Sequence, residues 1–155
     1  MRKTIAILSV IWAVVWCGIF LVWGLVVALV VNAMDPRNAL ALGQDWVAMF
    51  QSYWALGGLV IGPLAMLVLA LNMRRPGWWI DAFAFAISAF GVVGVTLVFV
   101  HPLDIWLLDL PLVGDAREAT RLWGGYVGPW AQLNWLRCAC CAAALGVLVW
   151  GRWTP

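Results

Sequence analysis

Four long apolar stretches, separated by short segments that hold most of the polar residues, make up the greater part of the sequence. They cover residues 4–32, 48–72, 80–100 and 130–150. A hydrocarbon core about 30 Å thick takes about 20 helical residues to cross, and each stretch is long enough to do so. The pattern therefore predicts an all-α, integral membrane four-helix bundle, with residues 1–155 in a single transmembrane domain.

The composition agrees with this interpretation. Hydrophobic residues make up 66% of the chain and charged residues 10%, whereas a soluble domain carries roughly 25% charged residues. The short connecting segments leave no room for a separate soluble core. The formal net charge of +2 is small and gives no basis for nucleic acid binding, so the first partner we expect is the lipid bilayer.

The distribution of basic residues predicts the orientation. Five of the nine basic residues lie before the first stretch, between the second and third, or after the fourth: Arg2, Lys3, Arg74, Arg75 and Arg152. Loops rich in Lys and Arg face the cytoplasm, so both termini are predicted to be cytoplasmic. We expect the protein in the bacterial inner (cytoplasmic) membrane.

A cleaved signal peptide is an alternative interpretation of the first stretch. Val31-Asn32-Ala33 resembles a small-residue cleavage site that follows a basic start and an apolar region. The apolar region is about twice the usual length of 7–15 residues. This length favours a retained membrane span.

The connecting segments differ in length and character. The inner turn, residues 73–77, is short and contains Pro76, so the second and third helices should be antiparallel neighbours. The outer segment, residues 101–128, mixes apolar and charged residues and is predicted to be a structured outer loop between helices 3 and 4. Asp115 followed by Glu118 resembles a capping box at the start of a short helix.

Small residues within the stretches predict helix contacts. Gly58 and Gly62 form a GxxxG pattern, which is typical of a face that packs closely against another membrane helix. Cys138 and Cys141 would share a helical face, but a tetrahedral metal site needs four ligands and His101 is the only histidine. The cysteines are therefore interpreted as small packing residues, and we predict no metal and no cofactor.

The polar residues near the outer end of the bundle are the candidate functional residues. His101 and Asp104 directly follow the third stretch, and Trp130, Asn134 and Arg137 follow one another at steps of four and three. Residues at these steps share one face of a helix. The side chains of Trp130, Asn134 and Arg137 should therefore point the same way.

Two interpretations of Arg137 compete. Its position in the fourth stretch places it about 9 Å inside the outer boundary, from where its side chain can reach the headgroups. Alternatively, Arg137 pairs with an acidic group such as Asp104 in a polar network, which Gln51, Asn32 and Asp35 can join because they lie at a similar depth.

The thirteen tryptophans lie mostly near the predicted membrane interfaces, where an indole buries its ring and hydrates its N–H. Trp12, Trp16 and Trp23 instead share a face within the first stretch. They form either a packing stripe or a wall for a flat ligand. We take Trp23, Trp130 and Gln51 as the candidate ligand-binding residues.

Two short motifs in the second half of the chain support a family resemblance. Pro102-Leu103-Asp104 and the spacing of Trp130, Asn134 and Arg137 resemble the anthrone-oxygenase-like family of small four-helix membrane proteins. That family usually carries asparagine where this chain has Asp104. The resemblance implies a four-helix bundle and, for members with an assigned activity, oxygenation of polycyclic anthrones to anthraquinones without an obvious metal cofactor.

If the chain is such an enzyme, His101 or Asp104 would remove a proton from the substrate, and Arg137 with Asn134 would stabilise the oxyanion. The ligand would be a flat aromatic or quinone-like molecule. A non-catalytic accessory subunit of a larger membrane complex, or a homo-oligomer, is the alternative. A transporter is less favoured, because charges within the predicted spans are nearly absent.

Overall fold

The computed structural model describes residues 2–50, 53–71 and 77–153, and these residues are helical apart from short connections. The elements are α1 (Arg2–Leu29), η1 (Val31–Ala33), α2 (Pro36–Phe50), α3 (Tyr53–Ala70), α4 (Trp78–Ser88), η2 (Ala89–Gly94), η3 (Thr96–Val100), α5 (His101–Leu108) and α6 (Ala116–Trp153). The predicted all-α class is confirmed. Of the predicted inner turn, only Gly77 lies within the described residues, and its φ of 76° suits a glycine.

Three helical runs are long and apolar enough to cross a membrane: Thr4–Ala33, Trp78–Leu108 and Ala116–Gly151. They mark the chain as an integral membrane protein by length and composition. The predicted stretch 48–72 includes positions outside the described residues, and its described apolar part, Gly57–Ala70, is shorter. α3 nevertheless packs along α4, as expected for neighbouring helices.

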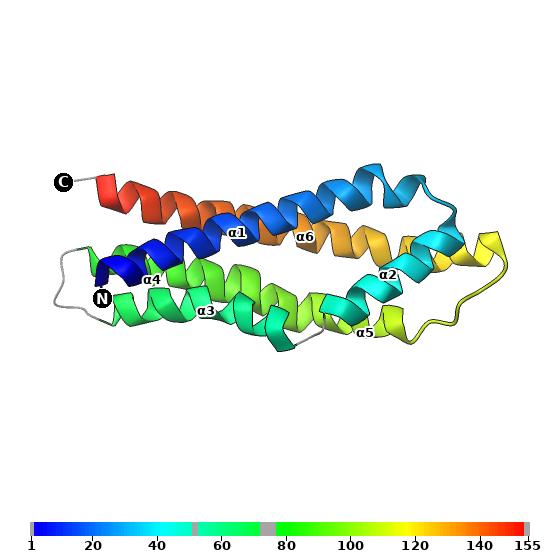
Figure 1. Cartoon of the computed structure of the whole chain (residues 1–155), viewed down its shortest axis with the longest axis horizontal. Helices are drawn as coiled ribbons and strands as arrows, with labels where there is room; N and C mark the ends of the chain where they lie inside the picture. Colours follow the sequence, from blue (N-terminus) through cyan, green and yellow to red (C-terminus); the bar gives the residue numbers. More distant parts are fainter. Residues whose placement is uncertain (1, 51–52, 72–76, 154–155) are drawn as a thin grey trace.

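The helices form an elongated bundle (Figure 1). α1 and α6 lie side by side, and α3 and α4 lie beside them. α2 returns along one half of the bundle and α3 along the other, so both run opposite to α1. α1 begins and α6 ends at the same end of the bundle. We call the opposite end, where α2, α5 and the start of α6 meet, the distal end.

The structured loop expected between the third and fourth helices is mostly helix. α5 extends the third helical run to Leu108, and α6 begins at Ala116 instead of near residue 130. The short helix predicted at Asp115 is therefore the first part of α6, which at 1.5 Å per residue is about 57 Å long. Leu122 and Trp123 explain this extension, because they are buried against apolar residues of α2 and α5.

α2 occupies a segment expected to be a connecting loop. Its start has a clear local cause, because the Asp35 carboxylate accepts a hydrogen bond from the Arg37 N–H at 2.9 Å and Pro36 takes the first helical position. Ala39, Leu40, Gly43 and Val47 form its buried face. Gln44 fixes α2 to α5 by donating to the main-chain oxygens of Leu107 at 2.9 Å and Leu110 at 2.8 Å.

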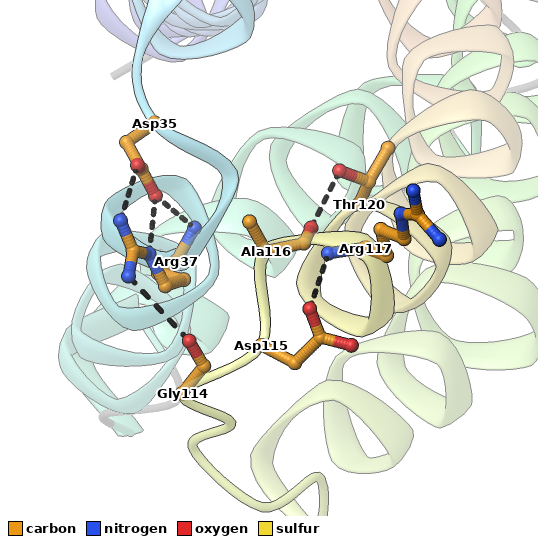
Figure 2. A network of polar contacts seen from close by, with 7 residues as sticks. All are labelled: Asp35, Arg37, Gly114, Asp115, Ala116, Arg117 and Thr120. Carbon is orange, nitrogen blue, oxygen red and sulfur yellow. Dashed lines mark hydrogen bonds and ion pairs between the residues drawn. The ribbon is translucent and has the colours of Figure 1, made fainter.

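Figure 2 shows how the two connections of the distal end meet. Arg37 pairs with Asp35 at 2.8 Å and also donates to the Gly114 carbonyl at 3.4 Å. The hydrogen bonds that the Asp35 carboxylate accepts from the side chain and main chain of Arg37 lower the pKa of Asp35 to about 2. Asp35 is thus ionised and caps α2 throughout the physiological pH range.

Asp115 caps α6 in the same way. Its side chain accepts from the Arg117 N–H at 3.1 Å, and its carbonyl accepts from the Ala119 N–H at 3.0 Å. The predicted N-cap is confirmed, but Glu118 pairs with Arg121 at 2.7 Å instead of completing a capping box. The reason is that Arg121 lies one turn further along the same helix face.

The predicted glycine contact on α3 is confirmed. A Cβ added to Gly62 would overlap the indole of Trp12 on α1. The indole N–H groups of Trp12 and Trp16 both donate to the Gly58 carbonyl, at 3.0 and 3.2 Å. The GxxxG face thus receives two tryptophans of α1. A second close approach brings Cys140 of α6 against Gly91 of η2.

The cysteines are free thiols. Cys17 and Cys138 face each other between α1 and α6 with their sulfur atoms 3.9 Å apart, and Cys141 is fully buried in the apolar core. In the described part of the chain, His, Cys, Asp and Glu form no group of three or more that could hold a metal ion.

Two apolar cores follow one another along the bundle. The first contains Trp12, Phe20 and Met66 and involves α1, α3, α4 and α6. The second contains Leu40, Leu107 and Trp123 and joins α2, α5 and α6 to the end of α1. Residues of both cores border the cavity described next.

Candidate functional site

A cavity of about 150 Å³ lies where the two cores meet. Its aromatic lining residues are Trp16, Phe20, Trp23, Trp46, Phe50, Trp123, Tyr126 and Trp130. Its polar lining residues are Thr96, His101, Asp104, Asn134 and Arg137. A flat apolar molecule with a few polar groups would match this lining.

Arg137 is the most deeply buried charge of the cavity, with 6% of its surface exposed. Its Nη2 donates to the Asn134 Oδ1 at 3.0 Å, and its Nη1 lies 3.4 Å from the Thr96 Oγ1. The guanidinium carbon lies 4.5 Å from the centre of the Phe20 ring, in cation–π range. The Nε is buried without a hydrogen-bond partner. Arg137 therefore faces the interior of the bundle and does not reach toward headgroups.

Asn134 holds Arg137 in place. It is 1% exposed, and its Nδ2 donates to the Phe20 carbonyl at 2.8 Å while its Oδ1 accepts from Arg137. This pair of bonds fixes which way the amide points. Gly24 allows the close approach, because a Cβ there would lie 3.0 Å from the Asn134 Nδ2.

Asp104 has a different partner from the one predicted. The Tyr126 hydroxyl donates to its Oδ1 at 2.9 Å, and the Arg137 guanidinium donates to Asn134 and Thr96 instead. The hydrogen-bonded pair predicted between Arg137 and Asp104 is therefore not formed, although the two charges are close enough to interact electrostatically. The cause is local, since Asn134 lies one helical turn from Arg137 and Tyr126 already occupies one carboxylate oxygen.

The two π-helical segments position the polar residues of the third helical run. η2 and η3 cover most of residues 89–100 and end directly before His101. In an α-helix, residues 96 and 101 would point about 140° apart, whereas a π-helix widens the turn so that residues five apart come together. Thr96, His101 and Asp104 consequently all line the cavity.

The aromatic wall joins α1 to α2. The Trp23 ring packs edge-on against Trp46 at 4.4 Å and Phe50 at 5.1 Å. On the other side, Tyr126 lies between Trp123 at 5.7 Å and Trp130 at 6.4 Å. Phe50 is 43% exposed and marks where the cavity approaches the outer surface.

A comparison with protein families identifies the chain by its sequence. The model of the family described as anthrone oxygenase matches residues 46–147, which is more than half of the chain. The chain belongs to the anthrone oxygenase family. No curated protein and no solved structure matches it.

The family match covers most of the cavity. Its range includes the candidate residues His101, Asp104, Trp130, Asn134 and Arg137. α1, which supplies Trp16, Phe20 and Trp23, lies before the matched range. The cavity of this anthrone oxygenase family member thus combines the matched part with a wall from its first helix.

The structure brings together six of the seven candidate residues on this cavity: His101, Asp104, Trp130, Asn134, Arg137 and Trp23. Gln51 lies outside the described residues. Asn32 and Asp35 are not among the lining residues, because Asn32 accepts from the Trp123 indole at 3.2 Å and Asp35 pairs with Arg37.

Sequence reasoning missed several contributors to this cavity, among them Tyr126, Trp46 and Thr96. Tyr126 falls within the predicted outer loop, residues 101–128, and Trp46 falls between the first two predicted stretches. Thr96 lies in a π-helical segment, for which the sequence gives no clear signal. The Asp35-Pro36 pair could have revealed α2, and with it Trp46, because Asp at the N-cap followed by Pro is a helix start signal.

Proposed function

We propose that the protein binds a flat, hydrophobic aromatic or quinone-like ligand in this cavity and oxygenates it, as the name of its family suggests. One observation carries the proposal. A buried guanidinium, with one N–H that has no acceptor, lines a cavity walled by aromatic rings. A ligand oxygen would satisfy that N–H, and the rings would cover the ligand faces.

The reaction would begin at Asp104 or His101, which also line the cavity. Asp104 or His101 removes a proton from an acidic C–H of the ligand, and Arg137 and Asn134 stabilise the negative charge that develops on the ligand oxygen. The carbanion then reacts with dioxygen. Overall, a CH₂ group loses two hydrogens and gains one oxygen atom as a carbonyl, and the second oxygen atom leaves as water.

The setting of this reaction is part of the proposal. The chain would form a four-helix integral bundle of the bacterial inner membrane, with α3 in the second crossing and both termini in the cytoplasm. Both termini at one end of the bundle support this topology. Cysteines introduced at Gly77 and at the exposed Gly114, where an added Cβ meets nothing within 4 Å, should then react with an impermeant thiol reagent from opposite sides, in a variant whose native cysteines are replaced by serine.

The test of function uses the full chain in lipid nanodiscs. With anthrone as the substrate, the wild type should consume one dioxygen per carbonyl formed. Arg137→Gln should weaken anthrone binding about tenfold to a hundredfold, since a charge-assisted hydrogen bond contributes about 1.5–3 kcal/mol. Arg121→Gln is the matched control, because Arg121 pairs with Glu118 at the exposed start of α6.

The same nanodisc preparation distinguishes the proposed enzyme from the alternative, a non-catalytic accessory subunit. An accessory subunit would retain a partner chain during mild purification, and Arg137→Gln would leave its ligand content and oxygen uptake unchanged. A folded protein that neither binds an aromatic ligand nor consumes oxygen would refute the proposed function.

A further inference from the structure

Tyr126 is the one residue that the structure hydrogen-bonds to Asp104 within the described part of the chain. Its hydroxyl donates to the Asp104 Oδ1 at 2.9 Å, and both residues line the cavity. Tyr126 is 4% exposed, so its hydroxyl is well shielded from competing donors and acceptors. A hydrogen bond to an ionised group is among the stronger ones in proteins. Tyr126 therefore sets the position of the Asp104 carboxylate.

The hydroxyl of Tyr126 is itself held in place by the aromatic rings around it. The Tyr126 ring lies between Trp130, with the two ring planes 27° apart, and Trp123, at 5.7 Å. The Trp123 indole N–H donates to Asn32 at 3.2 Å, and a Cβ on Gly43 would lie 2.7 Å from the Trp123 ring. Close packing of this kind leaves a side chain little freedom to move. The hydrogen-bond donor to Asp104 is thus fixed before any ligand binds.

The two oxygens of Asp104 differ in what they contact. Oδ1 accepts from Tyr126, whereas Oδ2 accepts no hydrogen bond from the residues that the structure describes. A carboxylate accepts hydrogen bonds or a proton on either oxygen, so Oδ2 can take a proton from a ligand. The Tyr126 O–H and the positive charge of Arg137 stabilise the carboxylate against the cost of its burial.

His101 lines the same cavity but is held less firmly. It lies three residues before Asp104 on α5, and no hydrogen bond to another described residue orients its ring. A general base works best when it is fixed within hydrogen-bond reach of the proton that it removes. Of the two candidate bases, Asp104 is the one whose position is fixed.

We infer that Asp104 is the base of the proposed reaction, acting through its Oδ2, and that Tyr126 is the positioning residue that holds its carboxylate. This inference rests on the proposed function, because it assigns the proton transfers of that reaction to one residue. It also gives a role to Tyr126, which the proposed function does not use.

One carboxylate can serve both proton transfers. Oδ2 takes the first proton of the ligand CH₂ group, and the electron pair stays on the ligand, with its charge spread onto the ligand oxygen. The carbanion adds dioxygen, and the resulting peroxide anion takes the proton back from Oδ2. Oδ2 then removes the second proton while the O–O bond breaks, which leaves the carbonyl and a hydroxide ion. The hydroxide takes this proton and leaves as water, so Asp104 ends as the carboxylate.

Proton removal can be measured separately from oxygenation. The full chain in nanodiscs is incubated with anthrone in deuterium oxide without oxygen, and exchange of the CH₂ hydrogens for deuterium is followed by mass spectrometry. The wild type should accelerate this exchange above the rate in nanodiscs without the protein. Asp104→Asn keeps the shape of the side chain but takes up no proton, so it should lower the acceleration about a hundredfold or more while anthrone still binds. His101→Gln should retain clearly more of the acceleration than Asp104→Asn.

A second variant tests the role of Tyr126. Tyr126→Phe removes the hydroxyl and keeps the ring, so it should slow the exchange at saturating anthrone about tenfold and leave the Kd for anthrone unchanged. A purely structural role would lower the midpoint of thermal unfolding without changing the exchange rate of the folded protein. Thr120→Val is the matched control, because its hydroxyl donates to the Ala116 carbonyl at 2.8 Å at the exposed start of α6 (Figure 2).

The outcomes separate this inference from the proposed function. If Asp104→Asn keeps the exchange and His101→Gln loses it, or if Tyr126→Phe exchanges as fast as the wild type, the inference is wrong and the proposed function stands. If the folded wild type neither binds anthrone nor accelerates the exchange, both are wrong. Asp104→Asn decides which residue is the base even where Tyr126→Phe fails to fold.

Discussion

The contact between α1 and α3 gives the sharpest stability prediction. Gly62→Ala places a methyl group within the space of the Trp12 indole, so the ring or the helix must move. Trp12 is buried, and its N–H donates to the Gly58 carbonyl at 3.0 Å. A shift of the ring would therefore also stretch this hydrogen bond.

The magnitude follows from three contributions. Overpacking costs about 1–3 kcal/mol, and loss of the hydrogen bond costs about 1 kcal/mol. Replacing glycine by alanine within a helix returns about 1 kcal/mol. The net loss of unfolding free energy is about 2 kcal/mol, which corresponds to a fall in Tm of about 4–8 °C for a chain of this size.

The assay is unfolding in mixed detergent micelles, followed by helix content and by tryptophan fluorescence. Gly57→Ala is the matched control, because nothing lies within 4 Å of its added Cβ. It should leave the midpoint unchanged or raise it slightly. Equal midpoints for the two variants would refute the close packing of Trp12 on Gly62.

Three further predictions concern polar contacts. Gln44→Leu removes two hydrogen bonds to the end of α5 and should cost about 1–3 kcal/mol, with faster hydrogen exchange in α2 as the direct measurement. Asn134→Leu leaves Arg137 and one main-chain carbonyl without their partner and should lower the unfolding free energy by about 2–4 kcal/mol, whereas an unchanged value would contradict the network. The folded-state pKa of Asp35 is about 2 and its unfolded value about 3.9, so its stabilisation is present above pH 4 and is lost as the pH falls toward 2. In a pH titration, the stability difference between wild type and Asp35→Asn should vanish below that range, and a difference that persists there would have another cause than the pairing with Arg37.

Three of the four predicted spans and one face of the site could be predicted from sequence, because the spans depend on the length of an apolar run and the face depends on local helical spacing. Spacing alone placed Asn134 and Arg137 on one face, and the structure shows them hydrogen-bonded to each other at 3.0 Å. The partner of Asp104 could not be predicted in this way. Tyr126 reaches it only because α6 begins at Ala116 and stays helical through Pro129, and that continuity depends on packing against α2 and α5.

The π-helical segments show a second limit of sequence reasoning. A period of 3.6 residues places Thr96 and His101 on different faces, but η3 ends at Val100 and both side chains line the cavity. The wider turn of η2 coincides with the approach of Cys140 to Gly91. This is a tertiary contact that no local pattern indicates.

The energetics of Arg137 support the proposal that the cavity binds a ligand. A charged residue near the centre of a membrane helix costs about 2.5–3.5 kcal/mol on insertion scales, and a buried donor without an acceptor adds about 1–3 kcal/mol. Asn134, Thr96 and the Phe20 ring offset part of this cost, but none of them reaches the Nε. A leucine would pack the same space without either penalty. A ligand oxygen that accepts a hydrogen bond from the Nε would remove the remaining cost. The free energy gained by pairing this donor would then contribute to ligand binding.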